Sequence, residues 1–264
     1  MRPRAGWQPI DLRELWRYRE LWWVLALRDV RVRYKQTVLG AAWAIIQPLL
    51  QMVIFVAFFS GFSPPNVVPQ LFFFSGLLPW QLFATSLTNA SNSLVGNQNL
   101  ITKVYFPRLV MPIASVVTGL IDFCVAMGIF ALMMVWYRCP PAPTFWLFPV
   151  FVMLAFLAAL AVGLWLSAMN VEYRDIRYVI PLLVQAWMFL TPIIYPASHV
   201  HRHWARILLG LNPMSGPVES FRWCILGTEF HPQVLVVSVV MIFSLLISGA
   251  FYFRRMEKSF ADVV

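Results

Sequence analysis

Residues 36–102 read QTVLGAAWAIIQPLLQMVIFVAFFSGFSPPNVVPQLFFFSGLLPWQLFATSLTNASNSLVGNQNLIT and contain no Asp, Glu, Lys or Arg. A charge at mid-depth in a bilayer costs at least about 2.5–3.5 kcal/mol, whereas a soluble domain exposes its loops and much of each helix to water. An uncharged run of 67 residues therefore predicts that the chain is embedded in a membrane. The basic stretch RDVRVRYK at 28–35 precedes the run, and Lys103 and Arg108 follow it, so the water-facing residues gather at its ends.

The composition supports an all-α integral membrane protein. Of the 264 residues, 60% are hydrophobic and 12% are charged, against roughly 25% charged in soluble domains. The apolar segments have the length of helices that cross about 30 Å of hydrocarbon, and are too long for barrel strands. We expect a membrane domain at 37–253, preceded by a cytoplasmic interface segment at 1–36 and followed by a cytoplasmic tail at 254–264. The net charge of +9 indicates contact with anionic lipid head groups, because the basic residues lie at segment ends, and no nucleic acid partner is expected.

Hydropathy and the Pro-rich connectors SPPNVVP and YRCPPAPT predict membrane-spanning helices. Six are expected, at 38–60, 71–91, 109–136, 145–169, 179–195 and 234–253. Residues 196–233 are too long for a connector and too apolar for a free loop. They predict two short helices broken at Asn212–Pro213, placed as re-entrant or interfacial segments on the outer face because each is too short to span.

The first 36 residues mix Leu and Trp with Arg in a helical rhythm. This pattern fits an amphipathic helix in the plane of the membrane interface, and it fits equally a short cytoplasmic helix packed on its own protein. The apolar side would hold Leu12, Leu15, Trp16, Trp22 and Trp23, and the basic side Arg17, Arg28, Arg31 and Lys35.

The distribution of Lys and Arg predicts the orientation. With six spans both termini share one side, and sixteen of the 20 basic residues then lie with them. The other four are Arg138, Arg202, Arg206 and Arg222. Since basic residues are retained in the cytoplasm, we expect both termini there, in a multi-pass protein.

Motifs for covalent chemistry are absent from the sequence. None of the lysines, Lys35, Lys103 and Lys258, follows a Gly, so this chain has no phosphate-cradling loop of the Gly-Lys-Ser/Thr type. No catalytic triad or paired acids stand out, and we expect neither enzymatic activity nor a bound cofactor or metal.

A few polar residues keep alternatives open. Alternating His199, His201 and His203 offer a weak metal hypothesis. Asp122, inside a span, is either a proton or ion site or an acid hydrogen-bonded to Thr118. Cys139 and Cys224 share the predicted outer face, where a disulfide is chemically possible and free thiols are favoured.

Aromatic residues inside the predicted spans suit either lipid contact or a path for sugar rings, which stack on aromatic faces. Trp43, Trp187 and Phe189 are the candidates for such a path.

Five blocks, in order along the chain, resemble the permease subunits of polysaccharide ABC exporters of the ABC-2 type membrane-domain family. They are RDVRVRYKQTVLGAAWAIIQPLLQMVIF, FSGLLPWQLFATSLTNASNSLVGNQNLITKVYFPRLVMPIAS, NVEYRDIRYVIPLLVQAWMFLTPIIYP, NPMSGPVESFR and FRRMEKSFADVV. The resemblance implies a six-spanning homodimer in the bacterial inner membrane, bound to two copies of a separate ATPase that carries ATP and Mg²⁺. It implies export of O-antigen, capsular polysaccharide or teichoic acid on a polyprenyl diphosphate lipid, and leaves open which of these polymers is carried.

The resemblance also assigns residues. The segment NQNLITKVYFPR resembles a coupling loop that contacts the ATPase, with candidates Asn97, Leu100, Lys103, Tyr105, Phe106 and Arg108. A diphosphate needs cations where it meets the inner leaflet, and the candidates are Arg28, Arg31, Arg33 and Lys35. Two alternatives remain: an ABC-2 exporter of small lipids or drugs, and a membrane-bound prenyl or glycosyl transferase. The second would rely on the acids Glu172 and Asp175.

Overall fold

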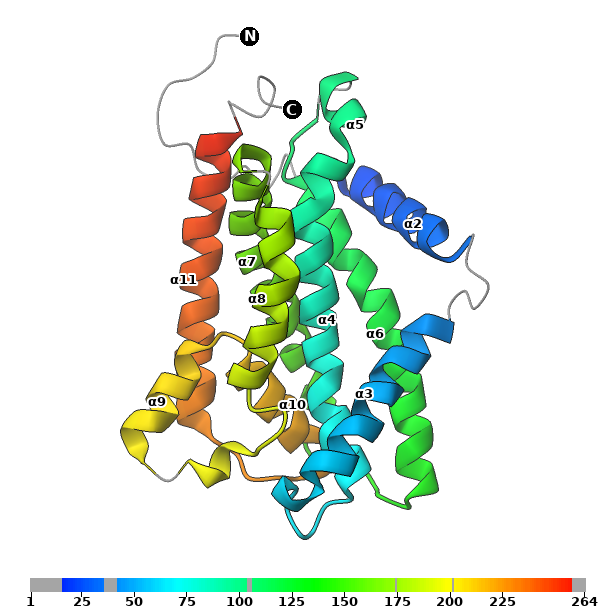
Figure 1. Ribbon diagram of the computed structural model, residues 1–264, viewed down its shortest axis with the longest axis vertical. Coiled ribbons are helices and arrows are strands. Elements are labelled where there is room, and N and C mark those ends of the chain that lie inside the picture. The colour runs from blue at the N-terminus through cyan, green and yellow to red at the C-terminus, as the bar shows by residue number, and fades with distance from the viewer. Residues whose placement is uncertain (1–15, 36–41, 104–105, 174, 201, 258–264) are drawn as a thin grey trace.

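The computed structural model describes residues 16–35, 42–103, 106–173, 175–200 and 202–257, and within them the chain is helical with no strand. Figure 1 shows the long helices running side by side, with α5 (Gln98–Lys103) at one end of the bundle and α10 (Ser215–Leu226) toward the other. We call these ends the α5 end and the α10 end. The long helices are α3 (Trp43–Phe59), α4 (Pro69–Gly96), α6 (Val110–Trp136), α7 (Phe148–Glu172) and α11 (Pro232–Met256).

Five segments of the described chain are long and apolar enough to cross a membrane, which confirms that the protein is an all-helical, multi-pass membrane protein. They are Ile45–Phe62, Pro69–Gly96, Val110–Trp136, Phe145–Glu172 and Pro232–Met256.

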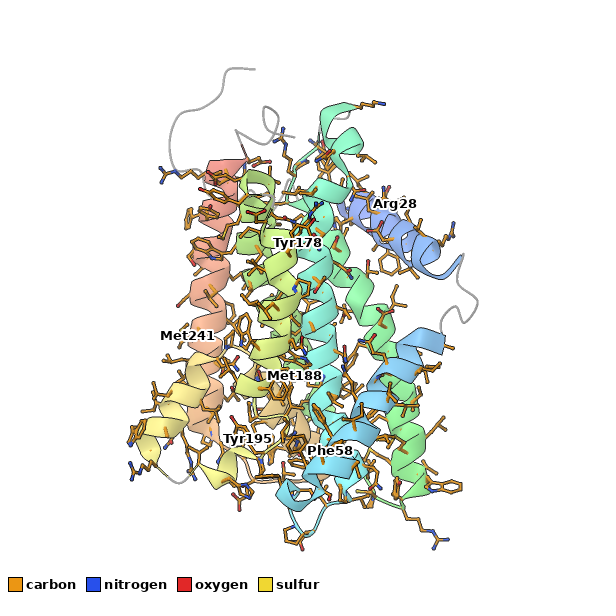
Figure 2. The ribbon with its side chains drawn as sticks, viewed as in Figure 1. Arg28, Phe58, Tyr178, Met188, Tyr195 and Met241 are labelled. Atoms are coloured by element: carbon orange, nitrogen blue, oxygen red, sulfur yellow. The ribbon has the colours of Figure 1, made fainter. Side chains whose placement is uncertain are left out.

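The predicted span 179–195 is shorter than expected. Its helix, α8 (Ile176–Leu190), has 15 residues and ends five residues early. Thr191 is extended, with φ −94° and ψ 140°, because the ring of Pro192 disfavours helical geometry in the residue before it. Figure 2 nevertheless shows Tyr178 of α8 toward the α5 end and Tyr195, just beyond α8, toward the α10 end. The sixth span therefore stays a prediction.

Helix α4 is the centre of the bundle. Eighteen of its 28 residues are buried, because α3, α6, α7, α8 and α10 all contact it. Small residues take part in its contact with α7: a Cβ atom at Gly163 on α7 would lie 2.9 Å from the Cβ of Ala90 on α4. Small residues let two helix backbones approach closely, which is the usual way in which helices associate in lipid.

Helix α2 (Arg19–Lys35) lies across the long helices at the α5 end and packs on α6 (Figure 1). Leu25 and Ala26 are buried against the protein, whereas Trp23, Val24 and Val32 are exposed. One face of the helix thus packs on its own chain, and another offers large apolar side chains to its surroundings. Whether this helix lies in the membrane interface or in the cytoplasm stays a prediction.

The region between α8 and α11 holds the two short helices predicted from the sequence. Helix α9 (His203–Leu211) and helix α10 are separated at Asn212–Pro213, as expected. Ten of the twelve residues of α10 are buried, including Cys224, so α10 is part of the protein interior.

Cys139 and Cys224 are free thiols, and burial raises the pKa of the Cys224 thiol to about 12.

Candidate functional site

The α5 end presents a short helix that is tied to the bundle at its start. Asn97 separates α5 from α4, and its backbone N–H donates to the Leu94 carbonyl at 3.1 Å. Its side-chain Nδ2 donates to the Ser93 carbonyl at 2.8 Å. Lys103, at the other end of α5, is exposed. A partner that pressed on α5 would therefore act directly on the end of α4.

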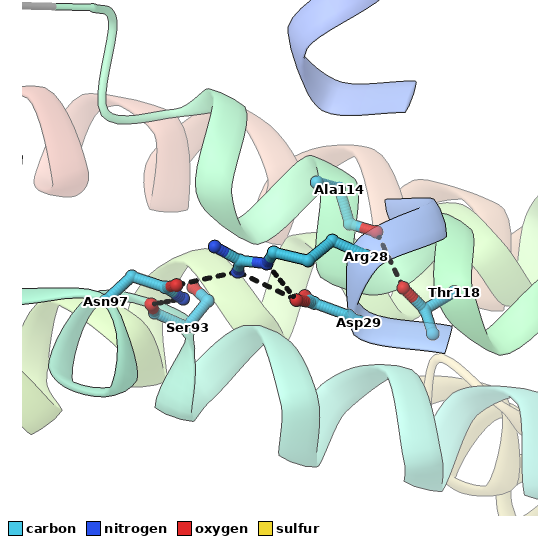
Figure 3. Close-up of polar contacts among 6 residues, drawn as sticks. All are labelled: Arg28, Asp29, Ser93, Asn97, Ala114 and Thr118. Atoms are coloured by element: carbon cyan, nitrogen blue, oxygen red, sulfur yellow. Dashed lines mark hydrogen bonds and ion pairs between the residues drawn. The ribbon is translucent and has the colours of Figure 1, made fainter. Parts of the chain in front are cut away.

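A hydrogen bond joins α2 to the start of α5 (Figure 3). One terminal nitrogen of Arg28, Nη2, lies 2.7 Å from Asn97 Oδ1 and 2.7 Å from Asp29 Oδ1. The predicted head-group residue Arg28 and the predicted coupling residue Asn97 are thus direct partners. Because Arg28 already pairs with a carboxylate and an amide, its charge is partly neutralised in this conformation.

A second contact ties the segment after α5 to the end of α11. The Arg108 guanidinium donates to the Glu257 carbonyl at 2.7 Å, and the Arg108 backbone N–H lies 3.3 Å from the Glu257 carboxylate. Between these contacts Phe106 is buried in a cluster with Leu25, Leu94 and Phe253. Phe106 therefore holds the segment to its own chain in this conformation and presents no surface to a partner.

The structure brings most of the predicted coupling residues together at the α5 end. Leu100 is partly buried against the Phe106 cluster, and Lys103 is exposed. Tyr105 lies outside the described residues. Of the remaining head-group candidates, Arg31 is exposed on α2, and the side chains of Arg33 and Lys35 lie outside the described set.

One face of α4 carries a row of uncharged polar side chains that the sequence reading did not single out. Gln81, Thr85, Thr88 and Asn92 recur every three or four residues and are partly exposed; we call them the α4 polar stripe. The hydroxyl groups donate to carbonyls four residues earlier, at 2.7 Å from Thr85 and 2.8 Å from Thr88, which leaves their oxygen lone pairs available. Such a row offers hydrogen bonds without fixed charge.

The α4 polar stripe extends to the neighbouring helices. Gln81 Nε2 donates to Gln51 Oε1 on α3, and Asn170 on α7 donates to Asn92 Oδ1 at 3.2 Å. Gln47 on α3 and Gln185 on α8 are exposed. Figure 1 shows α4 between α3 and α8, and both contact it. The faces that flank α4 therefore carry primary amides, which are costly to leave against hydrocarbon.

The predicted path aromatics have different surroundings. Trp187 is half-buried: its ring packs edge-on against Phe83 at 5.2 Å, and its Nε1–H donates to Asn212 at 2.9 Å. Phe189 on α8 is 53% exposed and is free to contact a partner or a cargo. The side chain of Trp43 lies outside the described residues. Trp187 is thus mainly a contact between α8 and the rest of the chain.

A fully buried ion pair lies in α10. Arg222 has no exposed surface, and its Nη1 lies 2.8 Å from the Glu219 carboxylate, which is 6% exposed. The guanidinium also donates to the carbonyls of Pro192 and Ile193, at 3.1 and 3.0 Å, and lies 3.9 Å above the ring of Phe72. Arg222 therefore holds the non-helical segment after α8 against α10 and α4.

Asn212 makes a second set of contacts with the same segment. Its Nδ2 donates to Thr191 Oγ1 at 2.9 Å and to the Leu190 carbonyl at 3.3 Å, while its Oδ1 accepts from Trp187. The Asn212 carbonyl accepts from Ser238 on α11 at 3.0 Å. Asn212 thus connects the corner between α9 and α10 to the end of α8 through its side-chain amide, and to α11 through its backbone carbonyl.

Sequence reasoning missed both roles. It placed Arg222 with the water-facing arginines of the outer side, which the structure corrects, since Arg222 is buried and paired. The available signal was the spacing of Glu219 and Arg222, three residues apart in an otherwise apolar helix, which puts the two charges on one face. Asn212 was used only as a helix breaker.

The remaining polar candidates gain no support as sites. Among the described residues no three His, Cys, Asp or Glu side chains converge as metal ligands, and His201 lies outside them. The Thr118 hydroxyl donates to the Ala114 carbonyl at 3.1 Å (Figure 3). Asp122 is partly exposed on α6, and its bond to Thr118 stays a prediction.

The fold is that of a multi-pass helical membrane protein, and residues 20–226 match the family model described as ABC-2 type transporter. The chain belongs to this family. "O-antigen export system permease protein RfbA" of Myxococcus xanthus is 32% identical over 251 residues, covering 93% of this chain and 96% of the relative. A relative of the same name from Klebsiella pneumoniae is 28% identical, covering 91% and 93%. "Polysialic acid transport protein KpsM" of Escherichia coli is 24% identical, covering 88% and 92%. The relatives are named as export or transport proteins, and this chain is accordingly a permease and not an enzyme.

Proposed function

We propose that this chain is the membrane-spanning subunit of an ATP-driven exporter that moves a polysaccharide, linked to a polyprenyl diphosphate lipid, across the bacterial inner membrane. The observation that carries the proposal is the likeness, over nine-tenths of both chains, to permeases named for O-antigen export. The α4 polar stripe supports it, because hydroxyl-rich cargo needs hydrogen bonds along its path.

ATP hydrolysis is proposed for a separate ATPase subunit that contacts α5. The chain has no phosphate-cradling motif of its own. The α5 end is proposed to face the cytoplasm, because it carries Arg19, Arg31, Lys103, Arg177 and Arg255, all exposed. In this arrangement both termini are cytoplasmic.

A second copy of the chain is proposed to cover the exposed faces of α3 and α8. Those faces combine large apolar side chains, such as Phe58 and Leu182, with the exposed amides of Gln47 and Gln185. Lipid would not satisfy the amides, whereas a water-containing path between two copies would. The cargo would then pass along the α4 polar stripe between the two subunits.

The test of the proposed function is reconstitution. The chain and its partner ATPase are placed in vesicles together with a lipid-linked glycan carrying a radiolabelled sugar. We expect labelled glycan to cross the bilayer only when ATP and both proteins are present. Turnover or modification of the glycan by the chain alone would support a transferase and contradict the proposal.

The exposed end of α5 should be essential for binding the ATPase. Lys103→Glu reverses a charge in the proposed interface, where like charges cost several kcal/mol, so we expect recovery of the ATPase with the permease to fall about tenfold or more. The amount of ATPase that co-purifies with the permease measures this recovery. The control is Arg202→Glu, the same reversal at an exposed position of the α10 end, which should leave ATPase binding unchanged. Equal binding by both variants would contradict the assignment of α5.

Of the two diphosphate candidates whose side chains are described, Arg28 is paired and Arg31 is exposed. A charge-assisted hydrogen bond contributes about 1.5–3 kcal/mol, so Arg31→Gln should lower glycan transport about tenfold while ATPase binding persists. The double variant Arg31→Gln with Arg33→Gln should lower it further. Arg19→Gln, also exposed on α2, is the control. Wild-type transport in the double variant would remove these arginines from the proposed site.

A further inference from the structure

We propose that the α10 end of α8 is a fixed pivot, held by Asn212 and Arg222, and that the α5 end of α8 is the part that moves during transport. This inference rests on the proposed function. It makes Asn212 and Arg222 positioning residues of the transporter, which act through α8 and do not touch the cargo.

The first observation is the uneven burial of this part of the chain. Ile180 is the one buried residue among the fifteen of α8, all of which are described. The segment that follows α8 is buried throughout, at Thr191, Pro192, Ile193 and Ile194. The shaft of α8 is therefore weakly held by its own chain, and its end is firmly held. In the proposed dimer the exposed face of α8 lies against the second copy, so the shaft can move relative to the rest of its own subunit with few contacts to break inside that subunit.

The second observation is how the backbone of the pivot is satisfied. The chain after Leu190 is not helical, so its carbonyl groups need partners from outside the helix, and an unpaired group buried in a membrane protein is costly. Asn212 donates to the Leu190 carbonyl, and Arg222 donates to the carbonyls of Pro192 and Ile193. Of the four carbonyls from Leu190 to Ile193, three are thus bonded by two side chains, and that of Thr191 accepts from the Ile193 backbone N–H at 2.7 Å. These bonds would be lost if the end of α8 left this position.

The third observation is that the pivot is anchored in the bundle. Ser238 on α11 donates to the carbonyls of Gly210 and Asn212, both at 3.0 Å, and accepts from the Gly216 backbone N–H at 3.0 Å. On the other side, the Arg222 guanidinium rests on Phe72 of α4 and lies against Gly76, where a Cβ atom would overlap with it. The pivot is therefore attached to α4 and α11 at once. A swing of α8 about this point displaces its α5 end, where Tyr178 lies (Figure 2).

Distances between spin labels on the two ends of α8 and α11 test the inference. One pair is Tyr178 with Ile247, and the other is Phe189 with Val236; all four residues are exposed. The labelled chain carries replacements of its three cysteines and is diluted with an excess of unlabelled chain, so that each complex holds at most one labelled copy. Distances are measured in the complex with the ATPase, without nucleotide and with ATP trapped.

We expect the Tyr178–Ile247 distance to shift on trapping and the Phe189–Val236 distance to stay constant. Equal shifts of both pairs, or no shift of either, would overturn the pivot. ATP hydrolysis is measured in the same preparations. A complex that does not form or does not hydrolyse ATP contradicts the proposed function itself, whereas hydrolysis with equal shifts contradicts only the pivot.

Variants of the pivot supply a second measurement. Asn212→Ala removes the side-chain bonds to Leu190, Thr191 and Trp187. If this variant does not fold, Thr191→Val takes its place, because valine is nearly the same size as threonine and the change removes only the bond between Thr191 and Asn212. We expect the glycan exported per ATP hydrolysed to fall about tenfold in Asn212→Ala, with a new shift in the Phe189–Val236 distance. The control is Val218→Ala, which makes a cavity in the neighbouring buried helix α10 and leaves the bonds of Asn212 and Arg222 intact. If export per ATP falls equally in the control, the effect is general destabilisation and the inference is wrong.

Discussion

Arg222→Met should destabilise the protein more than any other single arginine replacement in the described chain. Removing one partner of a buried ion pair costs about 3–5 kcal/mol, because the remaining charge stays buried without compensation. Here the carboxylate of Glu219 loses its charged partner, and the carbonyls of Pro192 and Ile193 lose the guanidinium donor. We expect the apparent midpoint of thermal unfolding in detergent to fall by on the order of 10 °C, measured by tryptophan fluorescence and gel filtration.

Two further variants separate the lost charge pair from lost packing. Arg222→Met combined with Glu219→Gln should recover part of the stability, because no unpaired charge is then buried. Arg202→Met, at an exposed arginine of the same region, should change stability by less than about 0.5 kcal/mol. If the double variant were less stable than Arg222→Met, the buried charge would not be the cause.

Gly249→Val should separate α11 from α7. A Cβ atom at Gly249 would lie 2.8 Å from the Trp165 ring and 3.0 Å from the Ala161 carbonyl. The Trp165 ring stacks on Tyr252 with the ring centroids 4.5 Å apart, and turning it away from Gly249 would break this stacking. The Ala161 carbonyl is part of the α7 backbone and can move only if the helix moves. Forcing extra atoms into such a contact costs about 1–3 kcal/mol or more, so we expect a lower unfolding midpoint and a smaller yield of folded protein.

The matched comparison is Gly128→Val on α6. No atom lies within 4 Å of the Cβ position there, so the same two methyl groups meet open space. We expect this variant to fold in wild-type amounts and to keep its unfolding midpoint. Equal losses in the two variants would mean that a β-branched residue in a membrane helix is the cause, and not the contact between α7 and α11.

The α5 end shows which features of the candidate site could be predicted from the sequence and which could not. The segment from Asn97 to Arg108 was identified by its resemblance, and its charged and polar members do gather at one end of the bundle. The sequence could not show that Phe106 is buried or that Arg28 bonds to Asn97, since the second pair is separated by 69 positions along the chain. Which basic residues stay available for a ligand depends on such distant partners: among the described side chains of α2, Arg28 is paired, whereas Arg19 and Arg31 are exposed.

Hydropathy alone determined that this is a helical membrane protein and where five of its long helices lie, because a bilayer penalises every charge and every open backbone group in the same way at any position. The order of its motifs placed it among the ABC-2 transporters. The tertiary structure decided where α8 ends and that Asn212 and Arg222 hold its end. Those roles depend on which carbonyl groups a broken helix leaves open and which distant side chains reach them, and packing in three dimensions alone sets both.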